Sequence, residues 1–462
     1  MTTTSSQQIP PDVTFISLGA EINRLMQEHQ VPGVAVGVLY NGQTYTAGFG
    51  VNNINHSLPI TDTTLFQIGS ITKTFVGTLL MRMVEENMLD LDAPVISYLP
   101  EFRVQDEKTS DEVTIRHLLT HTAGWVGDFF IDTGEGDDAT EKYVDRMAVL
   151  PQIAPLGTHY SYNNAGFYLC GHIVEAIFSY IGPPKTFEQA MREMVFKPWD
   201  LAHCYLTPTD VMVHRFATGH RTGEQGAEVM TPWPLPRACQ AAGGIITNVR
   251  TLLGYTKKQM DVENHLLSAE SVQAMQSPQH MLWGEKESVG LSWHINDTHG
   301  VRVISHTGGT VGQISLLAMI PERDFALVVL TNSMAGRQLN PAAFRWALRH
   351  YLGIEPVMPK KRSSSAFERL QYTGTFSRPL ADMKLTLENG QLILYQINKG
   401  GFPTEDTPPA PSPEPAACDL CGKDRLLVCE GDNKGTVIDV IRHEDGSIGW
   451  IRVGRLYAKV KE

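Results

Sequence analysis

Residues 34–49 read VAVGVLYNGQTYTAGF and predict an antiparallel β-hairpin. Two strand-like runs, 34–40 and 43–49, flank Asn41-Gly42. This dipeptide is favoured in a two-residue hairpin turn because both central positions need a positive φ. The pattern therefore predicts two adjacent antiparallel strands early in the chain.

An amphipathic helix is predicted immediately before this hairpin. Apolar residues recur at helical spacing from Phe15 to Met26, and Val31-Pro32-Gly33 ends the pattern. After the hairpin, the middle of the chain carries helical stretches such as 73–86 and 166–178, separated by loops with Gly and Pro. This middle part is therefore expected to be mostly helical.

Strand patterns return at residues 301–305, 313–320 and 325–331, and a helix is predicted at 341–351. Strands at both ends of this unit, with helices between them, favour one antiparallel sheet built from both ends. We therefore expect an α+β fold over residues 1–355, in which an antiparallel sheet is flanked by helices and carries an inserted helical subdomain.

A connector and a second domain are predicted after this unit. Residues 356–366 contain prolines, serines and basic residues, the composition of an exposed linker. Further along, strand-like runs flank Asn389-Gly390 and residues 443–446, which predicts two hairpins. Residues 367–462 are therefore expected to form a small all-β, barrel-like accessory domain, interrupted by a Pro-rich loop at 403–415.

The composition is that of a globular protein, with 42% hydrophobic and 19% charged residues. The net charge of −12 argues against nucleic acid as a partner, because phosphate binding needs a basic surface. No run of 18 apolar residues and no secretory signal pattern is seen, so we expect no membrane partner and a cytoplasmic location. Six cysteines in a chain of this length predict free thiols.

Nucleophilic chemistry is indicated by Ser70-Ile71-Thr72-Lys73, where a polar loop leads into a predicted helix. The i, i+3 spacing puts Ser70 and Lys73 on one helix face. A serine hydroxyl becomes nucleophilic when a base takes its proton, and a lysine desolvated in a cleft can be that base. On its own, however, the motif is more often a helix cap with a solvated lysine.

Two further motifs change that interpretation. Tyr162-Asn163-Asn164 places a phenol and an amide where a loop meets a predicted helix. His306-Thr307-Gly308-Gly309 ends a predicted strand, where glycines allow a ligand to approach the backbone closely. The three motifs follow one another as S-x-x-K, Y-x-N and H-T-G.

With these motifs the chain resembles the serine β-lactamase and penicillin-binding protein superfamily, specifically its class C-like branch of esterases and D-amino-acid peptidases. The resemblance covers about residues 15–350 and extends to 118–124 and Ala242-Gly243-Gly244. It implies a β-lactamase/transpeptidase-like fold, and the tail resembles the small β-domains appended to some of these enzymes.

The same resemblance implies roles for individual residues. Ser70 would be the acylated nucleophile, Lys73 its proton acceptor and Tyr162 a second acid/base group. Asn164 would orient Lys73 and the substrate amide. The backbone N–H groups of Ser70 and Gly309 would form the oxyanion hole, with the rest of the H-T-G strand binding substrate. No metal or organic cofactor is implied, and the tail is expected to supply no catalytic group.

One position departs from the family pattern. His306 stands where β-lactamases and D,D-carboxypeptidases have a lysine that is thought to attract the substrate carboxylate. An imidazole carries less positive charge at pH 7. Efficient hydrolysis of β-lactams is therefore less expected than cleavage of a small ester or amide.

Three functions remain open. The first is an acyl-serine hydrolase of small esters, amides or short peptides with D-residues. The second is a β-lactamase or D,D-carboxypeptidase, which the missing export signal disfavours. The third is a non-catalytic binding or scaffold protein that kept the pocket, which the intact Ser70, Lys73 and Tyr162 disfavour. Assembly into a homo-oligomer is left open.

Alternative metal sites are less favoured. Cys418-x-x-Cys421, with Cys429 and His443, resembles half of a zinc site but lacks a second half with ligand spacing. His117 and His121 lie four residues apart without a third ligand. We expect free thiols in the first group, and packing and loop hydrogen bonds for the two histidines.

Overall fold

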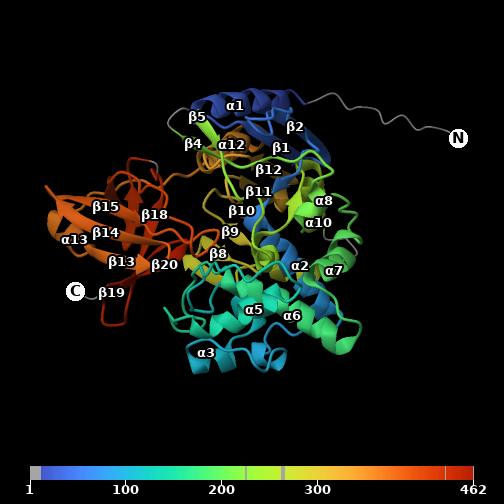
Figure 1. The fold of residues 1–462 in the computed structure, drawn as a ribbon. Coiled ribbons are helices and arrows are strands. Elements are labelled where there is room, and N and C mark those ends of the chain that lie inside the picture. The colour runs from blue at the N-terminus through green and yellow to red at the C-terminus, as the bar shows by residue number, and fades with distance from the viewer. Residues whose placement is uncertain (1–11, 224–225, 262–265, 432, 461–462) are drawn as a thin grey trace.

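The computed structural model describes residues 12–223, 226–261, 266–431 and 433–460. A sheet of eight strands, in the order β2-β1-β12-β11-β10-β9-β8-β7, lies at the centre, and a closed barrel lies beside it (Figure 1). The sheet strands are β1 (Gly33–Tyr40), β2 (Gln43–Gly50), β7 (His280–Trp283), β8 (Glu287–Val289), β9 (His294–Asn296), β10 (Val303–Gly309), β11 (Ile314–Ile320) and β12 (Phe325–Thr331).

The predicted hairpin is confirmed as β1 and β2, with Tyr40 opposite Gln43 in the register. Asn41 and Gly42 form the turn with φ values of 49° and 75°. Because residues alternate between the faces of a strand, Val34, Val36 and Val38 pack towards one side and Ala35 and Leu39 towards the other. Both faces of this part of the sheet are therefore buried.

Two helices cover the first face and the helical subdomain covers the second. On the first face lie α1 (Val13–His29), the predicted amphipathic helix, and α12 (Gly336–Leu352). On the second, α10 (Val249–Met260) packs against β1 and β12. The sheet is thus the middle layer of an α+β unit whose strands come from both ends of the unit, as expected.

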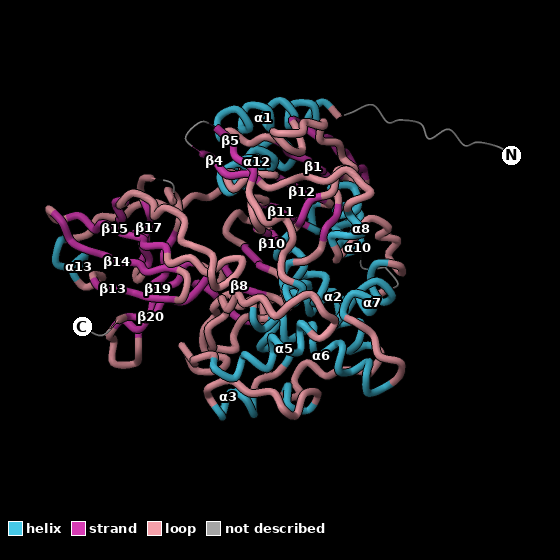
Figure 2. The backbone as a smooth tube through the Cα atoms, in the orientation of Figure 1, coloured by secondary structure: helices cyan, strands magenta, loops and turns pink. Residues whose placement is uncertain are grey.

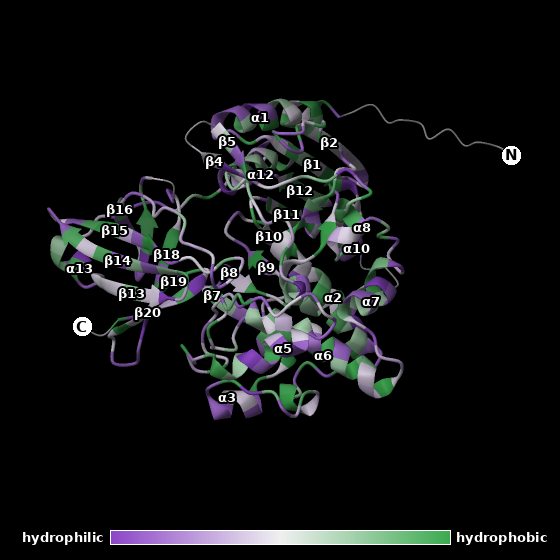
Figure 3. Ribbon diagram, viewed as in Figure 1, coloured by the Kyte–Doolittle hydropathy of each residue, from purple (hydrophilic) through white to green (hydrophobic). Residues whose placement is uncertain are grey.

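The helical subdomain is built around two long buried helices, α2 (Thr72–Glu85) and α6 (Ala165–Ile181). At its outer edge α3 has the polar sequence EKTSDE and is coloured purple in Figure 3. The helices of this part are α3 (Glu107–Glu112), α4 (Ile115–Leu119), α5 (Ala139–Arg146), α7 (Phe187–Met191), α8 (Pro208–Val211), α9 (Gln240–Gly243) and α11 (Ala269–Met275), with short sheets β3 (Phe66–Gln67)–β6 (Ile246–Thr247) and β4 (His220–Gly223)–β5 (Gly226–Val229).

Two predicted boundaries differ from the structure. The strand expected at 301–305 runs on to Gly309, so His306 lies within β10 and not at its end. The helix expected to begin at Pro341 begins at Gly336. The turn before Pro341 is held by its own hydrogen bonds to residues 333–335, so the proline removes one bond from a helix that has already started.

The tail forms a closed barrel in which β13 pairs with both β14 and β20, preceded by α13 (Ala366–Leu370). Figure 2 shows it as strand and loop beside the helical part. Its strands are β13 (Gly374–Arg378), β14 (Ala381–Glu388), β15 (Gln391–Asn398), β16 (Ala416–Gly422), β17 (Arg425–Val428), β18 (Val437–Arg442), β19 (Ile448–Val453) and β20 (Arg455–Lys459). None of the helices in the described parts of the chain has the length and apolar character needed to span a bilayer.

Candidate active site

Ser70 lies on a short 3-10 turn, Gly69–Ile71, that leads directly into α2. The turn is packed against β10 so closely that a Cβ on Gly308 would lie 1.9 Å from the carbonyl oxygen of Ile68. Ser315 on β11 also donates a hydrogen bond to that oxygen, at 2.7 Å. Only glycine fits at position 308, and the close approach fixes the Ser70 turn relative to the strand that carries the H-T-G motif.

The amine of Lys73 is completely buried and has three oxygen neighbours. Its Nζ lies 3.1 Å from Ser70 Oγ, 2.8 Å from Asn164 Oδ1 and 2.5 Å from the backbone oxygen of Ala242. The amide and carbonyl oxygens can only accept hydrogen bonds, whereas the hydroxyl can donate one. A neutral amine, with two hydrogens and one lone pair, satisfies all three partners while its lone pair faces the Ser70 hydroxyl.

Electrostatics favour the same protonation state. Burial lowers the pKa of Lys73 to about 7, and the nearby Arg455 charge lowers it further, against the opposing effects of Cys239 and Asp128. About half of the Lys73 side chains are then neutral at pH 7. A base of this strength beside a serine hydroxyl is suited to proton transfer near neutral pH.

Tyr162 and Asn164 lie where the chain enters α6, as the sequence predicts, and Asn164 is its N-cap residue. The Tyr162 ring lies 5.0 Å from Lys73 Nζ, measured to the ring centroid. Burial raises the pKa of the Tyr162 phenol, and the neighbouring Ser70 hydroxyl opposes this rise. The phenol is therefore protonated at neutral pH and available as a proton donor.

His121 packs against the face of the Tyr162 ring. Its ring stacks on the Tyr162 ring at a centroid distance of 4.4 Å, and its Nδ1 accepts a hydrogen bond of 2.9 Å from the backbone N–H of Asn163. Burial, with Lys73 as a further cause, holds the pKa of His121 well below its usual value. His117 has a different local role, since its Nδ1 accepts a hydrogen bond of 3.1 Å from the backbone N–H of Thr114, the N-cap residue of α4.

The H-T-G motif lies beside this cluster on β10. His306 is 2% exposed, its ring centroid is 6.1 Å from that of Tyr162, and its Nδ1 is 2.6 Å from the carbonyl oxygen of Thr307. Burial, together with His294 and Lys73, holds the pKa of His306 well below 6.5, so the ring is neutral. Among the described residues its Nε2 has no hydrogen-bond partner.

The remaining residues of the motif approach the Ser70 turn. The side chain of Thr307 is exposed, and Gly308 packs under the turn. A Cβ built on Gly69 would lie 2.6 Å from the backbone nitrogen of Gly309. The structure therefore brings every predicted site residue to one location.

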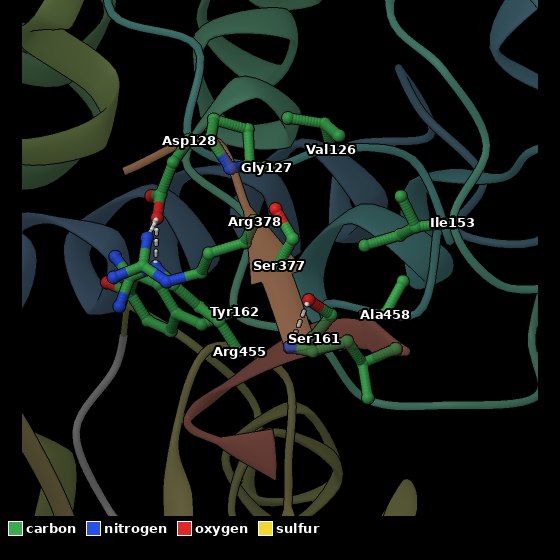
Figure 4. A pocket seen from close by; sticks show the side chains of 12 residues that line it. Val126, Gly127, Asp128, Ile153, Ser161, Tyr162, Ser377, Arg378, Arg455 and Ala458 are labelled. Atoms are coloured by element: carbon green, nitrogen blue, oxygen red, sulfur yellow. Dashed lines mark hydrogen bonds and ion pairs between the residues drawn. The ribbon is translucent and has the colours of Figure 1, made fainter. Parts of the chain in front are cut away.

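Sequence reasoning missed a group of charged residues at the interface with the barrel. Asp128, 3% exposed at its side chain, accepts a hydrogen bond of 3.0 Å from Asn164 Nδ2. Its other oxygen lies 2.8 Å from Arg378 Nη1 on β13 and 2.5 Å from Arg455 Nε on β20 (Figure 4). The guanidinium of Arg455 lies over the Tyr162 ring at 4.7 Å.

The tail was expected to supply no catalytic group, and the structure adds that it contacts the residues around Tyr162 directly. The backbone N–H of Tyr162 donates to the Gly454 oxygen at 2.9 Å, and that of Leu456 donates to Ser161 Oγ at 3.1 Å. The barrel thus holds both the backbone and the ring of Tyr162. No local sequence signal marks Arg455 or Asp128, because their approach depends on how the barrel packs.

A metal site is not formed by the described residues, where no cluster of three or more His, Cys, Asp or Glu side chains has suitable geometry. The six cysteines are free thiols. Cys421 and Cys429 point their sulfurs at backbone carbonyls of Arg425 and Leu427.

The chain is similar to known proteins in both sequence and structure. A family model described as Beta-lactamase matches residues 18–351. Penicillin-binding protein 4 of Amycolatopsis lactamdurans is 30% identical over 346 residues, which covers 71% of this chain and 88% of that protein. The unguisins hydrolase ungD of Aspergillus violaceofuscus is 23% identical over 426 residues, covering 85% of this chain and 71% of that protein. The crystal structure of SurE with D-Leu superposes with a TM-score of 0.73 at 23% identity, covering 97% of this chain and 99% of the other, so the barrel is part of the shared fold.

Proposed function

This chain belongs to the beta-lactamase family of serine hydrolases, and from that premise we propose that it cleaves small esters or amides, including peptides with D-residues, through an acyl-enzyme on Ser70. The observation that carries the proposal is the set of partners around Lys73. Two of them can only accept hydrogen bonds, so the lone pair of the neutral amine is left for the Ser70 hydroxyl.

The proposed reaction has two stages. Ser70 Oγ attacks the substrate carbonyl while Lys73 Nζ takes the hydroxyl proton. The developing oxyanion is stabilised by the backbone N–H groups of Ser70 and Gly309. Tyr162, protonated and next to Lys73, passes a proton to the leaving group, and water then releases the acyl group with the same residues acting in the reverse direction.

The choice of esters and amides over β-lactams rests on His306. A neutral imidazole can hydrogen-bond a substrate but offers no charge to a β-lactam carboxylate. The relative named as an unguisins hydrolase, and the fold neighbour crystallised with D-Leu, are in keeping with peptide substrates. A D,D-peptidase or β-lactamase remains the second candidate, favoured by the 30% identity to a penicillin-binding protein.

The test is a Ser70→Ala variant assayed with p-nitrophenyl butyrate and a fluorophosphonate probe. We expect both turnover and labelling to be lost, because Ser70 is the hydroxyl that lies beside the Lys73 amine. Lys73→Ala and Tyr162→Phe should each lose roughly 10²- to 10⁴-fold in kcat, the usual range for positioned acid/base groups.

Ser17→Ala is the matched control, because Ser17 lies on the exposed face of α1 and bonds only to its own helix. It should keep full activity. Wild-type labelling in Ser70→Ala, or losses below about tenfold in both other variants, would refute the assignment.

A further inference from the structure

A pocket lies where the barrel meets the catalytic unit, next to the Ser70 cluster. Its cavity volume is about 30 Å3, and it is lined by the loop 126–128, by Ser161 and Tyr162, and by residues of β13 and β20 (Figure 4). The charged side chains in its wall are Asp128, Arg378 and Arg455. One carboxylate therefore faces two guanidinium groups.

Arg455 uses only part of its hydrogen-bonding capacity. A guanidinium has five N–H donors in a planar fork. Arg455 meets Asp128 through Nε, and no hydrogen bond or ion pair joins its two terminal nitrogens to the other described residues. Its side chain keeps 30% of its surface exposed. The terminal end of the guanidinium is thus unpartnered among the described residues, on a side chain that is partly exposed.

Asp128 cannot take up this free end. One of its oxygens accepts from Asn164, and the other is shared by Arg378 and Arg455. The neighbouring Lys73 and His306 supply no negative charge that could pair with Arg455, because burial lowers the pKa of both towards their neutral forms. The pocket wall therefore has one positive charge without a counter-ion.

The position of this charge relates it to the reaction. The Arg455 guanidinium and Lys73 Nζ lie 4.7 Å and 5.0 Å from the centroid of the same Tyr162 ring, and Lys73 contacts Ser70. A group bound to Arg455 is therefore within reach of a small substrate held at Ser70. Guanidinium forks bind carboxylates through two parallel hydrogen bonds.

We propose that the free end of Arg455 binds a carboxylate of the substrate, so that the barrel supplies the cation that β10 lacks at His306. The proposal rests on the proposed serine hydrolase function and narrows its substrates to esters and amides that carry a carboxylate near the scissile bond. Arg455 is then a specificity residue that acts in substrate binding.

The experiment compares matched substrates that differ only in charge. One pair has a phenylacetylglycyl group on 3-hydroxybenzoate or on 3-hydroxybenzamide, which puts the carboxylate in the leaving group. The other pair is the p-nitrophenyl monoester of terephthalate or of terephthalamate, which puts it in the acyl group. In at least one pair, wild type should prefer the acid about tenfold in kcat/KM, the effect of a charge-assisted bidentate contact in a partly wet pocket.

Arg455→Gln should bring that ratio to about one, and Arg455→Lys should keep part of it, because an ammonium retains the charge but not the fork. Arg425→Gln is the matched control: Arg425 is another barrel arginine that crosses to the catalytic unit, where it pairs with Glu287 at 2.7 Å. It should leave the ratio unchanged.

Failure of the inference can be told apart from failure of the function. Equal or absent reaction with the acid and the amide in both pairs, while fluorophosphonate labels Ser70 in wild type, overturns the role of Arg455 alone. A preference that persists in Arg455→Gln overturns it too. Absence of labelling at Ser70 overturns the serine hydrolase function itself.

Discussion

Lys73 sets the pH range in which Ser70 can be activated. Because burial lowers its pKa to about 7, the neutral amine gains population as pH rises through 7. We expect kcat/KM for a neutral ester to rise about tenfold per pH unit below this point and to level off above it. Deprotonation of Tyr162 should not lower kcat/KM near neutral pH, since burial raises the pKa of its phenol.

The measurement is a pH profile of kcat/KM from pH 5 to 9, with circular dichroism at each pH as the control for folding. A flat profile over this range would contradict a lysine base. A profile that falls from pH 6 to 8 would contradict it as well, because it would require the protonated amine.

His306 is the second residue with a measurable consequence. A lysine at this position would add a charge beside Tyr162 that can attract a carboxylate. We expect His306→Lys to raise the ratio of kcat/KM for nitrocefin over p-nitrophenyl butyrate several-fold, equivalent to about 1 kcal/mol. His306→Gln, which keeps a neutral hydrogen-bonding group, should leave the ratio near its wild-type value. An unchanged or lowered ratio in folded His306→Lys would refute this role.

At the scale of elements, the contact between β10 and the Ser70 turn determines the geometry of the site. Gly308→Ala places a methyl group where the Ile68 oxygen lies, at 1.9 Å, so the strand and the turn must separate. Because small misplacements of reacting groups are costly, we expect Ser70 labelling to slow by about 10²-fold.

Gly254→Ala on α10 is the control, since a methyl group there meets no atom within 4 Å. It should leave labelling unchanged and stabilise the protein by about 0.5–1 kcal/mol through its helix propensity. Labelling of Gly308→Ala at the wild-type rate would show that the turn adapts without moving Ser70.

The same elements show what local sequence can predict. The hairpins at Asn41-Gly42 and Asn389-Gly390 are confirmed, since turn chemistry and alternation lie within a few residues. The strands β7, β8 and β9 were not predicted from the sequence. Each is only three or four residues long and is stabilised by pairing with its neighbours in the sheet. For the site, S-x-x-K, Y-x-N and H-T-G could be located, whereas the contribution of Arg455 requires the packing of two separate units.

At the scale of the whole molecule, the ion cluster around Asp128 joins the barrel to the catalytic unit. We expect wild type to unfold in one transition seen by both Trp fluorescence and loss of activity. Asp128→Asn leaves Arg378 and Arg455 without their counter-ion in a mostly buried interface, and should lower the free energy of unfolding by about 3 kcal/mol.

Asp297→Asn provides the comparison, because the Asp297–Arg302 pair is of similar length, 2.9 Å, but lies at the surface of the catalytic unit. Its loss should cost less than about 1 kcal/mol. Equal costs for the two variants, measured by denaturant titration, would show that the cluster does not couple the two units.

The order of strands in the central sheet has a consequence for biosynthesis. Strand β1 has its partner β12 in a segment that is translated much later, with Val34 paired to Thr331. At synthesis rates of about 5–20 residues per second, the backbone edge of β1 that pairs with β12 stays unpaired for on the order of 15–60 seconds. During that interval the first hairpin has an unpaired strand edge, and we expect residues 33–50 to be the part of the nascent chain most able to pair with other chains.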